Sequence, residues 1–492
     1  MLIRTRPASN GMKEKFYLTT SIVYTNAAPH IGFAYELLIA DIIVRYKRLQ
    51  GINTHFLTGT DEHGTKIAKA AEAKGVNTQK FVDENTTKVK ALVKALGVDE
   101  HDFIRTSDRK RHWLGAQKLW QKIEKSGDLY KKKYKGLYCE GHEVFHTDNG
   151  IVNGECPDYP GRKLGIIEEE NYFFRLSKYT GELKKKLESG EIKITPESRK
   201  AEMISVINEG LEDVSFSRNV KSNPWGIPVP NDPTQTMYVW CDALSNYITA
   251  LGYGTSDDLN FKKFWLENKN IVHLIGKDIL RFHALIWPAM LMSAGIMPEK
   301  LEILVHGFIT VDGKKMSKSL GNVIDPMALI EKYNREAFRY YFAREISPFE
   351  DGDFNEKKFI ESYNANLANG LGNLLSRIMK MAEDNLGEPV PGFGKRKSPI
   401  FHSAMKGFNI QSAMDHIWKH ISELDEFIQK EKPFKIIKEN KVKGIEIIKK
   451  SVSELFHVAE LLGPFLPDTS RVIQDLIRKN KMPAKPLFPR RD

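Results

Sequence analysis

Cysteine is scarce in this sequence, with three residues in 492: Cys139, Cys156 and Cys241. So few thiols in a chain of this length exclude a disulfide framework, which usually supports small secreted domains. They suit a reducing compartment, and we therefore expect a cytoplasmic protein without structural disulfide bonds.

Long hydrophobic runs are also absent. The most apolar stretch, ALIWPAMLMSAGIM at 284–297, is shorter than a membrane span and contains Pro288. We recognise no secretory signal and no internal repeat. The opening MLIRTRPASNG carries Arg4 and Arg6 with no acidic residue before Glu14. This composition leaves open an organelle-targeting segment or a short disordered extension. We expect no membrane partner.

The composition that is present is that of a globular protein. Hydrophobic residues make up 41% and charged residues 28% of the chain, which argues against disorder. A chain of 492 residues is long for one hydrophobic core, so about two to four domains are expected. Lysine and arginine number 74 against 63 acidic residues, a net charge of +11, which favours a polyanionic partner without proving one.

The first part of the chain alternates strand and helix patterns. KFYLTTSIVYT (15–25) is β-branched and aromatic, and a turn at 26–29 precedes the helical pattern of 30–50, which ends before Gly51. INTHFLTGT (52–60) predicts a second strand, and GTKIAKAAEAKG (64–75) a second helix. Strand and helix alternating at this spacing predict a parallel sheet built of βαβ units.

The same pattern returns far downstream. IVHLIG (271–276) predicts a strand, a helix follows from about 278 to 292, and EILVHGFIT (302–310) predicts another strand. Between the two halves, 128–225 differs in character, and after about 363 the pattern is helical, with a loop at 387–399. We expect an α/β fold whose parallel sheet is split by an insertion and followed by an all-α region.

Two short segments suggest a phosphate site. GKKMSKSLGN (313–322) is either a polar surface turn or a lysine loop that meets a polyanion. Upstream, His30 and Gly32 lie in PHIG, between the first strand and its helix, where parallel sheets bind ligands. His30 either caps that helix or donates a hydrogen bond to phosphate. Lys315 and Lys318 would offset charge on the β- and γ-phosphates of a nucleoside triphosphate.

Together these segments resemble the two signature motifs of class I aminoacyl-tRNA synthetases, a His-Ile-Gly-His-type motif and Lys-Met-Ser-Lys-Ser. The chain is more closely similar to the bacterial-type methionyl-tRNA synthetases, from about Phe16 to at least Lys435. The second motif is complete at 315–319, whereas HIGF has Phe33 where a histidine is usual. The resemblance implies a Rossmann-type catalytic domain, with His30, Lys315, Lys318 and Asp61 as catalytic residues.

The resemblance also implies the residues of the amino-acid pocket. MYVWCDALSNYI (237–248) matches what we take as the pocket strand of the family, and Asp61 matches the partner of the substrate ammonium. A pocket of aromatic and aliphatic side chains suits a thioether. The matching positions are Ile22, Tyr24, Asp61, Trp240, Ala243, Leu244, Tyr247, Ile279, His283 and Trp287. Arg218 and Asp278 also match positions near the active site.

The insertion resembles a zinc knuckle that has lost a ligand. Cys139-x2-His142 is followed by Cys156-x2-Tyr159, so three metal ligands remain and a tyrosine occupies the fourth position. Structural zinc prefers four ligands, and we therefore expect the knuckle to persist as a fold without bound zinc. Two nearby residues are alternative fourth ligands: His146 and Asp158.

The C-terminal helices are expected to bind tRNA. Asn373 and Arg377 lie four residues apart, on one helix face, and match the anticodon-contacting pair of the family. Phe434 stands where the family usually has a tryptophan, and an unpaired anticodon base can stack on either ring. The predicted domains are the first half of the Rossmann catalytic domain (1–125), the connective insertion with the degenerate knuckle (126–235), the second catalytic half (236–310), the KMSKS loop and stem-contact region (311–362) and the helical anticodon-binding domain (363–492).

The resemblance implies a two-step ligase. Methionine and ATP with Mg2+ give methionyl-adenylate, and the methionyl group then passes to the 3′ end of tRNA(Met). Two alternatives remain: another class I synthetase, for isoleucine, valine, leucine or cysteine, or a non-catalytic tRNA-binding paralogue. The absence of an appended C-terminal dimerising domain predicts a monomer.

Overall fold

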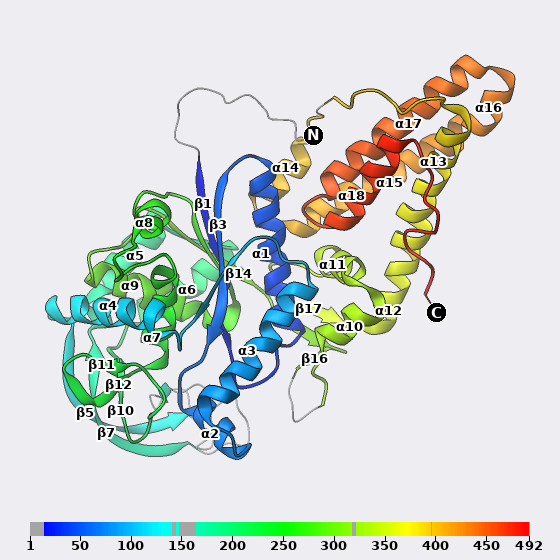
Figure 1. Ribbon diagram of the computed structural model, residues 1–492. Coiled ribbons are helices and arrows are strands. Elements are labelled where there is room, and N and C mark those ends of the chain that lie inside the picture. The colour runs from blue at the N-terminus through cyan, green and yellow to red at the C-terminus, as the bar shows by residue number, and fades with distance from the viewer. Residues whose placement is uncertain (1–13, 140–143, 147–163, 317–320, 395, 492) are drawn as a thin grey trace. The chain divides into compact units, whose positions relative to one another are not determined.

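The computed structural model describes residues 14–139, 144–146, 164–316, 321–394 and 396–491 (Figure 1). Its contacts divide the chain into two compact units. The first unit consists of Met1–Ala28, Ile52–Lys90 and Glu100–Val305, and the second of Pro29–Gly51, Ala91–Asp99 and His306–Asp492. Each unit is therefore assembled from segments that are distant in the sequence.

A seven-stranded sheet forms the centre of the first unit in the described part of the chain. β1 pairs in parallel with both β3 and β13, and β14 pairs in parallel with β8. The prediction of a parallel α/β sheet is confirmed. The strand order is β2 (Val23–Tyr24), β3 (Asn53–Asp61), β1 (Lys15–Thr19), β13 (Ile271–Gly276), β14 (Leu301–His306) and β8 (Ile192–Thr195), and β4 (Asp102–Arg105) also pairs with β3.

The strand predicted over 15–25 is interrupted at 20–22. Thr19 pairs with Leu57, whereas Val23 pairs with Thr60, so the first strand carries one more residue than its partner across this stretch. Such a bulge turns side chains away from the regular alternation and is frequent beside functional sites. Here it falls within 20–22, a stretch that includes Ile22, one of the predicted pocket residues.

Helices connect these strands and bury a large apolar core. Trp120, Trp265 and Trp287 are fully buried in one cluster of the first unit. The helix predicted from 278 to 292 is present but irregular, because a 3-10 turn (Lys277–Ile279) and a π-helical turn (Phe282–Ile286) precede α9 (Trp287–Ser293). The other long helices between β3 and β14 are α2 (Thr65–Ala73), α3 (Thr78–Ala95), α4 (Leu114–Lys125), α5 (Thr180–Ser189), α6 (Glu197–Glu209) and α7 (Val239–Thr249).

The insertion forms two small antiparallel sheets and supplies one strand to the central sheet. β8 lies inside the predicted insertion 126–235 but pairs with β14 at the edge of the central sheet. One small sheet contains β5 (Leu129–Cys139), β6 (Val144–His146), β7 (Gly165–Phe174) and β9 (Val214–Ser215), and the other β10 (Ser217–Asn219), β11 (Pro228–Val229) and β12 (Asp232–Met237).

The second unit begins with helix α1 (Ile31–Leu49) and a small three-stranded sheet. β15 (Ile309–Val311) pairs with β16 (Lys314–Lys315) as a hairpin and with β17 (Gly352–Phe354) in parallel. Two helices lie between β16 and β17 along the chain, and a third follows β17: α10 (Pro326–Tyr333), α11 (Arg335–Arg344) and α12 (Glu356–Ser362). The first half of the 313–322 segment is thus part of a hairpin.

The C-terminal part of the second unit is all helical, as predicted. α17 (Lys441–Leu462) packs against α13 (Asn373–Asn385), α15 (Ile410–Glu431), α16 (Pro433–Glu439) and α18 (Pro467–Lys479) (Figure 1). In α13 the buried Leu374, Leu375 and Ile378 recur at helical spacing, so one face is apolar. The loop predicted at 387–399 lies between α13 and α14 (Pro399–Lys406).

A buried ion pair holds α1 and α11 together in the second unit. Arg339 Nη1 lies 2.7 Å from Asp41 Oδ2, and both side chains are fully buried. The Arg339 guanidinium also donates to the carbonyl oxygens of Phe465 (2.6 Å) and Pro464 (3.0 Å). Removing either partner would leave a buried charge, so this contact restricts how the helices pack.

No helix among the described residues combines the length and apolar character needed to cross a membrane.

Candidate functional site

The predicted amino-acid pocket is built around Tyr247 on α7 and His283 in the π-helical turn. His283 Nδ1 lies 2.9 Å from the Ile279 carbonyl oxygen, which can only accept, so Nδ1 carries the proton. The other nitrogen, Nε2, therefore accepts from the Tyr247 hydroxyl at 2.7 Å. Burial lowers the pKa of His283 to about 4. The imidazole is thus neutral and fixed in one tautomer.

A second buried histidine, His273, packs against Tyr247 as well. Trp287 Nε1 donates to His273 Nε2 at 3.2 Å, so Nδ1 carries the proton and donates to Thr19 Oγ1 at 2.8 Å. The His273 ring stacks on Tyr247 with centroids 4.1 Å apart, and burial lowers its pKa well below the ordinary value. These polar atoms are satisfied by one another within a buried cluster of rings.

The other residues predicted for the pocket pack against the same cluster. Trp240 stacks on Phe282 with centroids 3.7 Å apart, and His283 meets the Trp240 ring edge-on. Ile22 and Ile279 pack against the cluster that contains Leu244, Tyr247 and Trp287, and Ala243 is buried on α7. Rings in stacked and edge-on arrangements suit a thioether, whose sulfur contacts aromatic edges favourably.

Residues 237–248 were predicted as a pocket strand, and this prediction is wrong. β12 ends at Met237, and α7 begins at Val239. Trp240, Ala243, Leu244 and Tyr247 recur at the spacing of one helical face, which is why the helix gathers them. That spacing was visible in the sequence and would have identified the helix.

Tyr24 and Asp61 lie side by side at the ends of their strands. Tyr24 pairs with Asp61 between β2 and β3, but its ring packs on a separate cluster formed by Ile67, Ala71 and neighbours. Asp61 is the last residue of β3, and the residue is 8% exposed. The Asp61 carbonyl oxygen accepts from both Thr25 N (3.0 Å) and Thr25 Oγ1 (3.1 Å).

Sequence reasoning missed a buried cluster that joins Asp61's neighbours to α7. Asp242 Oδ2 lies 2.6 Å from His63 Nδ1, and Oδ1 lies 2.7 Å from His112 Nε2. Burial opposes ionisation of Asp242, but His63 and His112 hold its pKa below the ordinary value. Burial raises the pKa of the adjacent Cys241 thiol, which argues against a nucleophilic role.

His30 and Gly32 lie at the start of α1 in the second unit. His30 is the N-cap, and its Nδ1 accepts from Gly32 N at 3.0 Å. In the neutral ring the proton is then on Nε2, which is a donor. A Cβ at Gly32 would lie 2.9 Å from His30 Cε1, so glycine permits this cap. Phe33, in place of the usual histidine, is buried at 6% exposure, as expected for an apolar ring in a closed environment.

The lysine loop begins next to that helix terminus. A Cβ at Gly32 would be 4.0 Å from Met316 Cε, and Ile31 N donates to the Ile324 carbonyl at 3.3 Å. The second unit thus brings the start of the KMSKS segment to the HIGF segment, as their pairing implied. Lys315 Nζ lies 5.3 Å from the centre of the Phe308 ring. Lys318 lies outside the described residues.

A further contact near this terminus was not predicted. His306, at the end of β14, places Nε2 3.0 Å from Glu36 Oε2 on α1 and Nδ1 2.7 Å from the Gly307 carbonyl. Both ring nitrogens thus have acceptor partners, a backbone carbonyl and a carboxylate. Neither His306 nor Glu36 belongs to a short motif, so only their positions in the fold bring them together.

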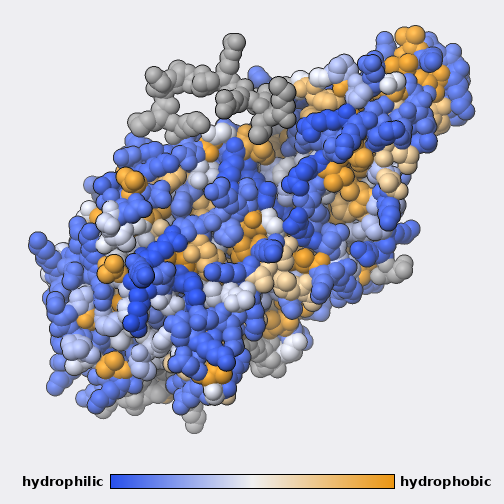
Figure 2. Space-filling model, viewed as in Figure 1, coloured by the Kyte–Doolittle hydropathy of each residue, from blue (hydrophilic) through white to orange (hydrophobic). Residues whose placement is uncertain are grey.

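The predicted anticodon residues lie on the C-terminal helices of the second unit. Asn373 is exposed on α13, and Arg377, one turn later, forms an ion pair with Asp425 at 2.6 Å. Phe434 on α16 is 47% exposed. Figure 2 shows apolar residues among hydrophilic ones at the α16 end of these helices, where Val442 is also exposed. An exposed ring offers a base a surface for stacking.

The structure describes Arg218 and Asp278, which were predicted to lie near the active site. Arg218 is buried, with its Nη1 donating to Ser215 Oγ at 2.7 Å, whereas Asp278 is exposed.

The zinc-knuckle prediction falls on Cys139, whose side chain is not described, and on His142 and Cys156, outside the described residues. The described part of the chain contains no cluster of three or more residues suited to bind a metal ion.

Comparisons with known proteins identify the family of this chain. The family model for class I tRNA synthetases (M) matches residues 16–164 and 160–379. The methionine–tRNA ligase of Thermotoga maritima is 40% identical over 490 residues, which cover 96% of this chain and 76% of the relative. The methionine–tRNA ligase of Rhizobium meliloti is 39% identical over 478 residues, which cover 94% and 91%.

Solved structures give the same result. The methionyl-tRNA synthetase of Mycobacterium tuberculosis in complex with methionyl-adenylate matches with a TM-score of 0.88 and 34% identity, covering 97% of this chain and all of that one. Its free form matches with a TM-score of 0.83 and 30% identity. The chain therefore belongs to the methionine–tRNA ligase family of class I aminoacyl-tRNA synthetases.

Proposed function

We propose that this chain activates methionine with Mg-ATP and transfers it to the 3′ end of tRNA(Met). In the first step a methionine carboxylate oxygen attacks the α-phosphate, which forms methionyl-adenylate and releases pyrophosphate. In the second, the terminal ribose 2′-OH attacks the methionyl carbonyl, and AMP leaves. No side chain needs to act as a nucleophile, because positioning and phosphate stabilisation carry the rate.

The observation that carries the choice of amino acid is the Tyr247–His283 contact of 2.7 Å. A neutral His283 whose nitrogens are both hydrogen-bonded offers no charge to a substrate side chain, and the surrounding rings favour a flexible thioether. Asp61 pairs with the substrate ammonium in this proposal. The family membership supports the same choice.

In this proposal, residues of the second unit bind the phosphates of ATP. His30 donates from Nε2 to the triphosphate, and Gly32 keeps the helix terminus accessible. Lys315 and Lys318 offset the charge that develops on the leaving pyrophosphate. The capped His30 beside the start of the lysine loop supports these roles.

The recognition of tRNA is assigned to the helical region 363–492. Asn373 and Arg377 contact anticodon bases, and Phe434 stacks on one of them. The chain acts as a monomer and, on its cysteine usage, in the cytoplasm. The proposed division of the rest of the chain is 1–125, 126–235, 236–310 and 311–362, with β8 of the insertion joining the central sheet.

ATP–pyrophosphate exchange with each amino acid in turn tests the proposal. Methionine should support exchange, and aminoacylation of tRNA(Met) should follow. Exchange with isoleucine, valine, leucine or cysteine instead would indicate another class I synthetase. A folded protein that exchanges with no amino acid but binds tRNA would be the non-catalytic paralogue.

A further inference from the structure

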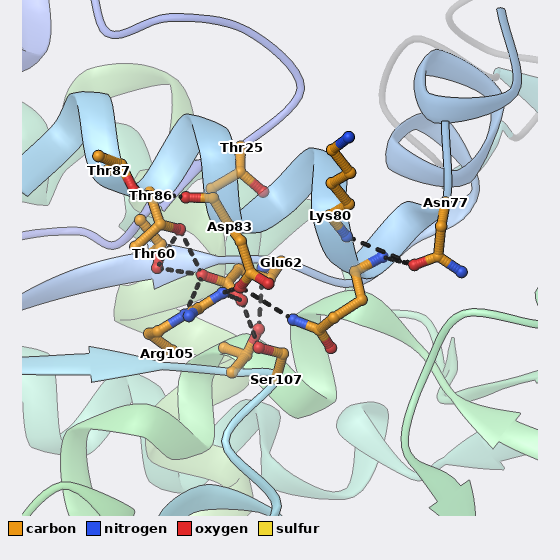
Figure 3. Close-up of polar contacts among 12 residues, drawn as sticks. Thr25, Thr60, Glu62, Asn77, Lys80, Asp83, Thr86, Thr87, Arg105 and Ser107 are labelled. Atoms are coloured by element: carbon orange, nitrogen blue, oxygen red, sulfur yellow. Dashed lines mark hydrogen bonds and ion pairs between the residues drawn. The ribbon is translucent and has the colours of Figure 1, made fainter. Parts of the chain in front are cut away.

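Glu62, the residue after Asp61, is the centre of a dense polar network in the first unit (Figure 3). Its side chain is fully buried and accepts five hydrogen bonds. Oε1 accepts from Thr60 Oγ1 (2.7 Å), Thr86 Oγ1 (2.6 Å) and Arg105 Nε (2.8 Å), and Oε2 from Arg105 Nη2 (2.9 Å) and Ser107 Oγ. Figure 3 shows these side chains converging on Glu62 from β3, α3 and the end of β4.

The backbone on both sides of Glu62 is held as well. The peptide between Asp61 and Glu62 has both polar atoms engaged, because the Asp61 carbonyl accepts from Thr25 and Glu62 N donates to Thr106 Oγ1 at 2.8 Å. The Glu62 carbonyl accepts from Trp225 Nε1 at 2.5 Å. These contacts determine the orientation of the peptide plane, and thereby the direction of the Asp61 side chain.

Burying the Glu62 carboxylate costs free energy of hydration, which argues for a role beyond stability. A carboxylate that is fully buried loses its hydration, and an ion pair such as Glu62–Arg105 stabilises a fold little more than apolar packing would. The gain from a multiply bonded buried carboxylate is a defined geometry. That geometry is imposed on the residue adjacent to Asp61, which the proposed function pairs with the substrate ammonium.

We propose that Glu62 is a positioning residue that holds Asp61 in place to read the α-ammonium of methionine. Arg105 extends the anchor to Asp83 on α3, with which it forms a second ion pair, so the end of β3 is tied to two neighbouring elements. This inference rests on the proposed function. It predicts that loss of the Glu62 anchor weakens recognition of the ammonium and leaves the thioether pocket and the ATP site intact.

Exchange kinetics of Glu62→Gln test this inference. The glutamine side chain has nearly the same shape as glutamate but presents an amide donor toward Arg105. We expect the KM for methionine to rise about 10- to 100-fold, as for a misplaced binding group, with the KM for ATP within about twofold. Competitive inhibition by 4-(methylthio)butanoate, which lacks the ammonium, should be unchanged. Arg105→Ala provides a second variant in case Glu62→Gln does not fold.

Asp128→Asn is the matched control in the same unit. Asp128 is also a buried carboxylate with several donors: Lys178 (2.6 Å), Tyr179 (2.6 Å), Ser293 (2.8 Å) and Ser126 (3.0 Å). Its substitution should lower the melting temperature without raising the KM for methionine. In an Asp61→Asn background, adding Glu62→Gln should change the KM for methionine less than about twofold, because the group that Glu62 orients has already gone.

Three results would overturn the inference: an unchanged KM for methionine in a folded Glu62→Gln protein, equal weakening of 4-(methylthio)butanoate, or the same KM rise in Asp128→Asn. Failure of the proposed function is distinct, since the wild-type protein would then not exchange with methionine at all.

Discussion

At the scale of single residues, His30 has an observed role as the N-cap of α1 and a proposed role as a phosphate donor, and these roles use different atoms of one ring. Nδ1 accepts from Gly32 N, so capping and the proposed phosphate binding use different nitrogens. Asparagine at an N-cap retains the acceptor but has no group in the position of Nε2. Substitutions can therefore remove one role at a time.

We expect His30→Asn to keep the melting temperature of the parent while ATP–pyrophosphate exchange falls about 100- to 1,000-fold, the scale of losing one preorganised donor. His30→Ala should show the same kinetic loss and an additional destabilisation of about 1 kcal/mol, because the cap is lost too. Thermal denaturation and exchange rates of both variants measure this. Exchange by His30→Asn within a few fold of the parent would show that His30 is a cap alone.

A second residue-scale prediction concerns pH. Burial lowers the pKa of His283 to about 4, below the roughly 6.5 of an unfolded histidine. Between these values the unfolded chain binds more protons than the folded one, so stability falls as the pH drops from about 6.5 towards 4. His283→Gln should reduce this loss by at most about 3 kcal/mol. Urea unfolding at about pH 7 and about pH 4.5 measures it, and the same pH slope in both proteins would contradict the assignment.

At the scale of elements, the β15–β16 hairpin determines where the lysine loop begins. Asp353 Oδ1 on β17 accepts from Gly313 N at 2.7 Å and from Thr310 Oγ1 at 2.8 Å. Gly313 adopts a left-handed conformation (φ +74°), which glycine tolerates without strain. One carboxylate thus holds both the strand and the turn from which Lys315 extends.

Asp353→Ala should loosen this hairpin and lower the rate of adenylate formation about tenfold, with the KM for methionine unchanged, because a less ordered loop reaches the phosphates less often. Stopped-flow measurement of adenylate formation is the appropriate assay. The control is Glu361→Ala on α12, an exposed residue whose pairing with Lys357 is at the surface. A rate equal to that of the parent would show that the hairpin does not need Asp353.

The insertion permits a prediction about metal. Because Tyr159 occupies the fourth ligand position, the purified protein should contain well under one zinc per chain. Elemental analysis after purification without chelators measures the content. Stoichiometric zinc that survives mild chelation would contradict the prediction, and variants of His146 and Asp158 would then identify the missing ligand.

At the scale of the whole molecule, chemistry and tRNA recognition can be assayed apart. Adenylate formation needs no tRNA, whereas aminoacylation needs both the adenylate and the tRNA. Arg377 is tied to Asp425 between α13 and α15, so its side chain has a structural partner as well as a proposed anticodon role. An assay of both reactions in one variant distinguishes these two roles.

Arg377→Ala should leave ATP–pyrophosphate exchange intact, while kcat/KM for tRNA(Met) falls by the equivalent of about 1–3 kcal/mol, as for loss of a specific base contact. Lys380→Ala is the control, since Lys380 lies on the same helix and pairs with Asp384 at 2.8 Å. It should have a smaller effect on aminoacylation. Equal damage to both reactions in Arg377→Ala would mean that the residue serves the fold.

The sequence by itself determined the local order of elements and the two signature segments. Strands at 15–19, 53–61 and 271–276 follow their β-branched patterns, and the lysine loop and PHIG are recognisable because their chemistry lies within a few adjacent residues. The strand predicted over 237–248 is wrong, although Trp240 and Tyr247 have helical spacing. Local patterns report propensity and burial, which depend on near neighbours.

Tertiary structure alone decided which distant groups meet. Asp242 contacts His63 from 179 residues away, Tyr247 contacts His283 across α7 and the π-helical turn, and Glu62 gathers donors from α3 and β4. The tautomers of His273 and His283 follow from such contacts. No sequence pattern encodes them, because a buried hydrogen bond depends on how packed elements place two atoms within about 3 Å, and packing is a property of the whole core.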